Sequence, residues 1–268
     1  MLLLLIILLL LFCLYLGCVS GRKGQPGLKN LQGWSYAHRS LHGEGRPENS
    51  MAAFQAALEG GYGIELDIHL LKDGNLAIIH DSSLKRTTGK DGRIEDLTTD
   101  ELKLYPLEGT EETIPTFREL LDLYGGKAPL IVELKPVDGN HAALCEAACA
   151  MLESYRGVYC MESFDPRCIS WLKKNRPQII RGQLSENFLK SDSKMPLPLR
   201  FVLTHFLLNF FNQPDFLAYK FADRKNLSVF LCRKANCVQG VSWTLKTKED
   251  YDTALKEGWI PIFEGFRP

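Results

Sequence analysis

Two carboxylates stand two positions apart in the segment GIELDIHL, residues 63–70. Glu65 and Asp67 alternate there with apolar residues, which is the period-two pattern of a β-strand. Both carboxylates therefore point to the same side of the strand. Two carboxylates this close repel each other unless a proton or a cation lies between them, and their oxygens suit a hard divalent cation. The segment predicts a cation-binding strand, with an ordinary solvated strand face as the alternative.

Polar side chains also end the strands predicted around this one. They are His38 and Arg39 after the first strand, His80 after the third, and Glu133 and Lys135 after the fourth. In a barrel of parallel strands the groups that do chemistry come from the carboxyl ends of the strands, so we expect all of them at one rim. Carboxylates there would hold a cation, Arg and Lys would bind an anion such as phosphate, and two histidines would act as acid and base. Each residue alone has a structural explanation, as a core histidine or a rim ion pair, but together they indicate a site.

The elements that must position these groups alternate between strand and helix about eight times from residue 34 to residue 263. This alternation predicts a parallel sheet, and the length suits an α/β fold of the TIM (β/α)8 barrel type. Residues 76–79, after the turn Asp73-Gly74, count as its third strand. The apolar segment 195–211 breaks the pattern and is read as a small helical insertion. It would act as a lid, touch a bilayer, or be an ordinary barrel helix with a wide apolar face.

The N-terminal residues 1–21 carry no charged side chain and consist mainly of leucine and isoleucine. At about 1.5 Å per residue such a helix spans a hydrocarbon core of about 30 Å. No basic residue precedes the run, whereas Arg22 and Lys23 follow it. We therefore expect a transmembrane anchor over 1–21, a linker over 22–33 and a catalytic domain over 34–268 on the cytoplasmic side. A secreted or lipid-anchored domain on the extracellular side is the alternative.

The overall composition excludes some partners. The 32 Lys and Arg residues equal the 32 Asp and Glu residues in number, so no basic excess indicates a nucleic-acid partner. The eight cysteines form no CxxC pair and have no histidine spaced for zinc. Their scatter over predicted helices and strands is typical of reduced, buried residues and favours a reducing compartment.

Five short motifs carry a resemblance to a known family. In chain order they are Tyr36-Ala37-His38-Arg39, Pro47-Glu48-Asn49-Ser50, Glu65-Leu66-Asp67, His80-Asp81 and Glu133-Leu134-Lys135. They resemble the glycerophosphodiester phosphodiesterase (GDPD) family over residues 34–268, and the N-terminus resembles a membrane-anchored bacterial branch. Ser163-Phe164 and Trp243-Thr244 agree with the same family. The resemblance implies a TIM barrel that uses a divalent cation, calcium or magnesium, to hydrolyse glycerophosphodiesters to glycerol 3-phosphate and an alcohol.

The resemblance also implies a role for each matching residue. Glu65, Asp67 and Glu133 match the metal ligands, His38 and His80 the acid and base, and Arg39 and Lys135 the phosphate-binding groups. Glu48 and Asn49 would support the rim, with Glu48 in or behind the ligand shell, and Trp243 would form an apolar wall for glycerol. One histidine would take the proton of a glycerol hydroxyl, the other would protonate the leaving alcohol, and water would open the cyclic phosphate.

The chain departs from the family pattern at Ser40 and in the loop 41–46, which is longer and more polar than a minimal one. His69 shares the carboxylate face but matches no ligand, so we give it no role. Ser40 stands where the family usually has glycine, which is acceptable unless the position needs a positive φ.

Two other functions fit the same barrel. A lysophospholipase D-type lipid hydrolase is favoured by the apolar insertion and the N-terminal segment. A non-catalytic module that binds glycerophosphate is the other alternative, although binding alone needs neither histidine.

Overall fold

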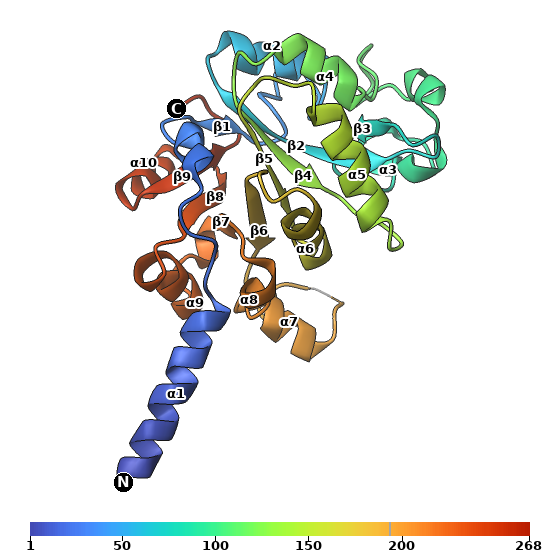
Figure 1. Ribbon diagram of the computed structural model, residues 1–268. Coiled ribbons are helices and arrows are strands. Elements are labelled where there is room, and N and C mark those ends of the chain that lie inside the picture. Colours follow the sequence, from blue (N-terminus) through green and yellow to red (C-terminus); the bar gives the residue numbers. More distant parts are fainter. Residues whose placement is uncertain (193) are drawn as a thin grey trace.

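Eight parallel strands close into a barrel in the computed structural model, which describes residues 1–192 and 194–268 (Figure 1). Around the barrel they are β1 (Tyr36–Ala37), β2 (Gly63–Leu70), β4 (Leu130–Leu134), β5 (Tyr159–Ser163), β6 (Arg181–Ser185), β7 (Phe216–Lys220), β8 (Gln239–Leu245) and β9 (Trp259–Phe263). Ala37 of β1 pairs with Ile64 of β2 and with Phe263 of β9, and these two pairings close the barrel. The predicted TIM-barrel fold is confirmed.

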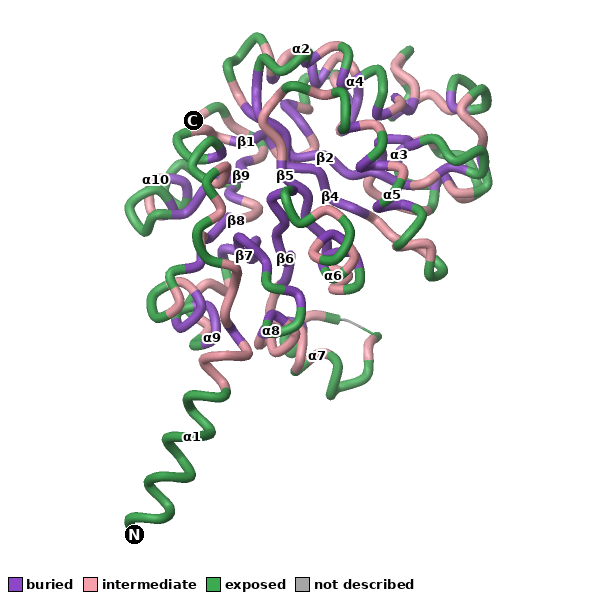
Figure 2. The backbone as a smooth tube through the Cα atoms, viewed as in Figure 1, coloured by how far each residue is buried: buried purple, intermediate pink, exposed green. Residues whose placement is uncertain are grey.

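Helices cover the outside of the barrel and leave the strands buried (Figure 2). The longer ones are α2 (Met51–Glu59), α4 (Phe117–Tyr124), α5 (His141–Leu152), α6 (Pro166–Asn175) and α10 (Lys248–Lys256). Shorter ones are α3 (Lys85–Thr88), α9 (Leu227–Phe230), η1 (Pro26–Leu31), η2 (Ile94–Asp96), η3 (Thr99–Leu104), η4 (Phe221–Asp223) and η5 (Leu231–Ala235). Several helices begin at residues whose side chains satisfy the free backbone N–H groups of the first turn. Ser50 accepts from the Ala53 N–H, and Thr116 forms a capping box with Glu119.

The prediction that residues 76–79 form the third strand of the barrel is wrong. β3 (Leu76–Ile78) lies outside the barrel and pairs antiparallel with the far end of β2, with Ile68 opposite Ile78. A turn at Asp73-Gly74 joins the two strands, and a connection this short allows only an antiparallel neighbour, because a parallel one needs a crossover of a dozen residues. The residues after this hairpin still return to the carboxyl end of β2, since the Ile79 N–H donates to the Asp67 carbonyl oxygen.

The apolar insertion forms two helices between β6 and β7. These are α7 (Leu197–Thr204) and α8 (Asn209–Asn212), and both lie at the edge of the molecule (Figure 1).

The N-terminal helix α1 (Leu2–Cys18) projects away from the barrel (Figure 1). No helix in residues 1–192 and 194–268 is both long and apolar enough to cross a membrane. The 17 residues of α1 extend roughly 25 Å, short of a hydrocarbon core of about 30 Å.

The expected transmembrane anchor over 1–21, and membrane association through it, are therefore not supported. The helix is shorter than the apolar run because the last residues of the run pack against the globular domain. Val19 is fully buried, and Arg22 forms an ion pair with Asp215 at 2.5 Å.

Candidate functional site

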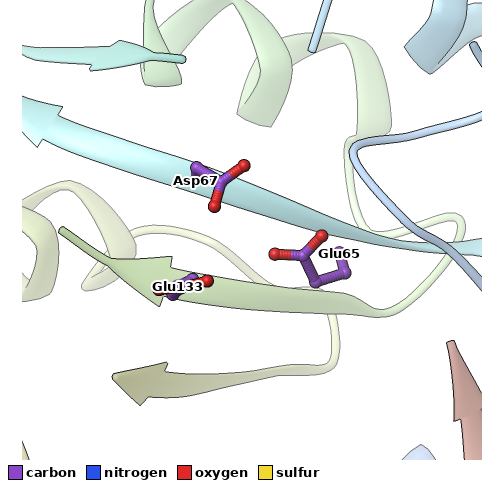
Figure 3. A group of neighbouring side chains, drawn as sticks. All are labelled: Glu65, Asp67 and Glu133. Atoms are coloured by element: carbon purple, nitrogen blue, oxygen red, sulfur yellow. The ribbon is translucent and has the colours of Figure 1, made fainter. Parts of the chain in front are cut away.

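Three buried carboxylates from neighbouring strands meet at the carboxyl end of the barrel (Figure 3). Glu65 and Asp67 lie on β2, and Glu133 lies on β4, in register with Asp67. One oxygen of each lies within 4.8 Å of the others. Burial and the nearby Asp67 and Glu133 raise the pKa of Glu65 well above its usual value, and burial raises that of Glu133 to about 7. These hard oxygen donors, whose negative charges repel, fit a divalent cation.

Cationic side chains flank the three carboxylates. Lys135 Nζ lies 2.7 Å from Glu133 Oε1 and 3.1 Å from Asp67 Oδ1. Arg39 Nε lies 3.7 Å from Asp67 Oδ2, and Asn49 donates to the same oxygen at 2.9 Å. Burial alone would raise the pKa of Asp67, but Lys135, His80, Arg39 and the Asn49 hydrogen bond lower it below its usual value. Asp67 is therefore ionised, and Lys135 and Arg39 offset part of the negative charge of the three carboxylates.

Each candidate histidine has a carboxylate partner. His38 Nδ1 donates to Glu264 Oε2 at 2.6 Å, and His80 Nδ1 donates to Asp81 Oδ1 at 2.6 Å. The hydrogen bond from His38 lowers the pKa of Glu264 to about 2, so this carboxylate is the acceptor. A carboxylate at Nδ1 fixes the tautomer and orientation of the ring and leaves Nε2 to exchange a proton. His38 Nε2 lies 3.9 Å from Glu65 Oε2, so this exchange would take place beside the three carboxylates.

Glu48 connects the two sides of the site. Its carboxylate lies 3.1 Å from Arg39 Nη1 and 2.6 Å from Arg86 Nη2, and Arg86 Nε lies 2.5 Å from Asp81 Oδ2. Glu48 thus contacts guanidinium groups and stands outside the group of three carboxylates. It links the phosphate-binding candidate Arg39 to the partner of His80.

A cavity of about 290 Å³ lies beside these groups, although Asp67 and Lys135 do not line it. His38, Arg39, Glu65, His80 and Glu133 line its polar side, and Phe164, Leu184 and Trp243 line its apolar side. The rings of Phe164 and Trp243 meet edge to face with centroids 5.6 Å apart. Trp243 therefore lies on the apolar side of the cavity.

Two carboxylates of this cavity, Glu162 and Glu264, were not predicted from the sequence. Glu162 of β5 is 1% exposed and in register with Glu133, and its Oε2 has no hydrogen-bond partner among the described residues. Burial and Glu133 raise the pKa of Glu162 well above its usual value. A charged residue within an otherwise buried strand was a usable signal for Glu162. Glu264 follows the last strand, where the rule of polar strand ends would have found it.

The structure shows the surroundings of His69, which received no role, and the backbone conformation of Ser40. His69 is buried between Glu95 Oε1, at 2.7 Å from Nδ1, and the His80 carbonyl oxygen, at 3.2 Å from Nε2. It therefore supports the segment that carries His80. Ser40 has a φ of 69°, so the condition under which serine is unfavourable is met at this position.

A closed barrel with acids, bases and cations at the carboxyl ends of its strands has the architecture of a TIM-barrel enzyme. Residues 38–264 match the model of the glycerophosphoryl diester phosphodiesterase family, and the chain belongs to that family. The protein is thus a phosphodiesterase, as predicted, and a purely non-catalytic module is set aside.

Relatives and solved structures agree with this assignment. A glycerophosphodiester phosphodiesterase of Caldanaerobacter subterraneus subsp. tengcongensis is 30% identical over 79% of this chain and 86% of its own length. A lysophospholipase D GDPD1 of Rattus norvegicus is 32% identical over 45% of this chain and 41% of its own. The structure of an Oleispira antarctica phosphodiesterase in complex with the product sn-glycerol-3-phosphate has a TM-score of 0.70 and 25% identity, over 86% of this chain and 92% of that one.

Proposed function

We propose that this protein hydrolyses glycerophosphodiesters to glycerol 3-phosphate and an alcohol, with a divalent cation held by Glu65, Asp67 and Glu133. The observation that carries the proposal is the meeting of three buried carboxylates with two histidine–carboxylate pairs around one cavity. The glycerol 3-phosphate product of the Oleispira antarctica relative supports the same product here. A calcium or magnesium ion suits the all-oxygen donor set and would supply positive charge at the phosphate.

The remaining groups bind and orient the substrate. Arg39 and Lys135 would contact phosphate oxygens, since Arg39 lines the cavity and Lys135 lies 2.7 Å from Glu133, which lines it too. Phe164 and Trp243 would pack against the carbon atoms of glycerol. The free oxygen of Glu162 would accept a hydrogen bond from a hydroxyl group of the substrate.

His38 and His80 would move the protons. One ring accepts the proton of the glycerol hydroxyl as its oxygen attacks phosphorus. The other donates a proton to the departing alcohol oxygen as the phosphorus–oxygen bond breaks. Water then opens the cyclic phosphate with the two roles reversed, which restores both rings and leaves glycerol 3-phosphate.

The test uses the full chain with glycerophosphocholine. We expect choline and glycerol 3-phosphate in calcium or magnesium, and no turnover after chelation. His38→Gln and His80→Gln should each lower kcat by about a hundredfold or more, the usual range for general acid–base groups. Full activity in chelator would refute the metal assignment, and no turnover in calcium, magnesium or manganese would refute the function.

The cytoplasmic location stays a prediction from the sequence, as does the division of the chain at residues 21/22 and 33/34. Protease protection in intact cells tests the location, because an extracellular barrel would be cleaved and a cytoplasmic one spared.

A further inference from the structure

A second cavity, of about 510 Å³, adjoins the catalytic one and is lined mainly by apolar side chains. Phe164 lines both cavities. Phe188, Leu199 and Leu203 also line the second cavity. We call this second cavity the apolar groove. The two charged residues at the groove, Asp165 and Arg167, pair with each other at 2.6 Å. The groove therefore offers a neutral, apolar path away from the catalytic cavity.

Hydrogen bonds hold the walls of the groove together. Arg200 of α7 donates to the carbonyl oxygen of Phe188 at 2.6 Å and to that of Ser191 at 3.0 Å. Ser185, at the end of β6, donates to the Leu203 carbonyl oxygen at 2.9 Å. The α7 helix is thus fixed to the rim of the barrel.

Aromatic contacts make the groove continuous with the catalytic wall. The Phe164 ring meets Phe188 at 6.1 Å and Trp243 at 5.6 Å between centroids. An apolar chain attached to a glycerol that lies against Trp243 would therefore reach the groove past Phe164. At the outer side, Leu197 and Phe201 of α7 are also exposed.

We propose that the apolar groove binds the single acyl chain of a lysophospholipid whose phosphodiester lies in the catalytic cavity. This inference rests on the proposed function and specifies its substrate. Water and lysophosphatidylcholine would give lysophosphatidate and choline, with the same phosphorus–oxygen bond broken as in the water-soluble diester. Glycerophosphocholine has no group that fills the groove, whereas an acyl chain gains binding energy from leaving water.

The proposed reaction also requires that the lipid carry only one acyl chain. A 1-acyl lysophospholipid keeps the glycerol hydroxyl beside the phosphate, which is the hydroxyl that attacks phosphorus. A diacyl phospholipid lacks this hydroxyl, so it should not be cleaved by this route.

The first experiment compares glycerophosphocholine with 1-acyl lysophosphatidylcholines of 6, 8, 10 and 12 carbons. It uses the full chain without detergent, because a detergent tail would occupy the same groove. We expect kcat/KM to rise by up to roughly fourfold per added methylene until the groove is filled. Diacyl phosphatidylcholine should show no turnover. Equal kcat/KM for all chain lengths in an active enzyme would overturn the groove, and turnover of the diacyl lipid would overturn the selection of one chain.

A pair of variants on α7 tests whether the acyl chain binds in the apolar groove. Leu199→Asp places a charge in the groove, and Phe201→Asp is the matched control, since both residues are exposed on α7 but Phe201 does not line the groove. Leu199→Asp should lower kcat/KM for the 12-carbon lysolipid at least tenfold and leave glycerophosphocholine unchanged. Phe201→Asp should change neither. Equal losses on both substrates, or equal effects of the two variants, would overturn the proposal.

A binding measurement separates the groove from the proposed reaction. Calorimetry compares 1-decanoyl-glycerol 3-phosphate with glycerol 3-phosphate, neither of which has an alcohol to lose. Tighter binding of the acylated ligand, removed by Leu199→Asp, supports the groove even if neither diester is hydrolysed, in which case only the proposed function fails. Equal affinities would overturn the groove even if glycerophosphocholine is hydrolysed.

Discussion

Charge on a few buried side chains controls how the candidate site can work. Glu65, Asp67 and Glu133 are buried and repel one another, and Lys135 offsets part of their charge. A substitution that removes one charge but keeps the shape of the side chain shows whether the residue binds the metal or only supports the structure.

Glu65→Gln should lower the cation-dependent kcat by about a hundredfold or more, because it replaces a charged ligand by a neutral amide. The melting temperature of the metal-free protein should not fall, since the raised pKa of Glu65 already favours its neutral form. Steady-state kinetics and thermal unfolding measure the two effects. Glu59→Gln, at the exposed end of α2, is the control. Unchanged activity in Glu65→Gln would remove Glu65 from the metal site.

Ser40 occupies a conformation that suits glycine. Its φ is 69°, its side chain is buried, and its hydroxyl has no hydrogen-bond partner within the described part of the chain. Ser40→Gly should stabilise the protein by about 1 kcal/mol, because relief of left-handed strain exceeds the entropy that glycine adds to the unfolded chain. Urea unfolding measures this change. Ser40→Ala keeps the strain and removes only the hydroxyl, so an equal gain in both variants would show that strain has no part.

At the scale of elements, local patterns predicted what a segment is better than where it lies. The alternation in residues 63–70 predicted β2 correctly, because side-chain parity is a property of the strand itself. The same reasoning found β3 but placed it in the barrel, since alternation does not identify a partner strand. The hydrogen bond between His38 and Glu264 joins residues 226 positions apart, and no local pattern reports such a contact.

The helix α3 offers a test of how one element positions another. Its Arg86 binds both Glu48 and Asp81, so Arg86→Met should release the partners of Arg39 and His80. We expect kcat to fall about tenfold, the range for residues that orient metal or catalytic groups, and the pH profile of kcat to shift. Arg176→Met is the matched control, because Arg176 pairs with Glu153 and contacts no residue of the site. A loss of stability with an unchanged kcat and pH profile would contradict a positioning role.

At the scale of the whole molecule, a cation that binds only the folded state must stabilise it. At a hundred times its Kd, calcium or magnesium should add about 2.7 kcal/mol, which raises Tm by roughly 5–10 °C. Differential scanning calorimetry measures the shift without reference to activity. The double variant with Glu65→Gln and Glu133→Gln should lose the shift, and an unchanged shift would place the cation elsewhere.

The rise in Tm caused by the cation should depend on pH. In the metal-free protein the pKa of Glu133 is raised to about 7, above that of an unfolded glutamate, near 4.3. Protonated Glu133 therefore contributes stability that is fully present below about pH 4.3 and is lost as pH rises through about 7. A cation competes with this proton, so its stabilising effect should be largest above pH 7 and should shrink towards pH 5. A shift that grows on acidification would contradict this competition.

The contacts that form the site join residues at very different separations along the chain. The three carboxylates come from residues 65–133, whereas the His38–Glu264 pair needs β1 and β9 to meet. Bringing distant segments together costs more chain entropy and is slower than pairing nearer ones. A refolding chain should therefore acquire its cation site before the contact between His38 and Glu264, and the metal would bind an intermediate that is still inactive. Rapid-mixing experiments would show cation uptake ahead of turnover, and simultaneous recovery would show that the barrel closes in a single step.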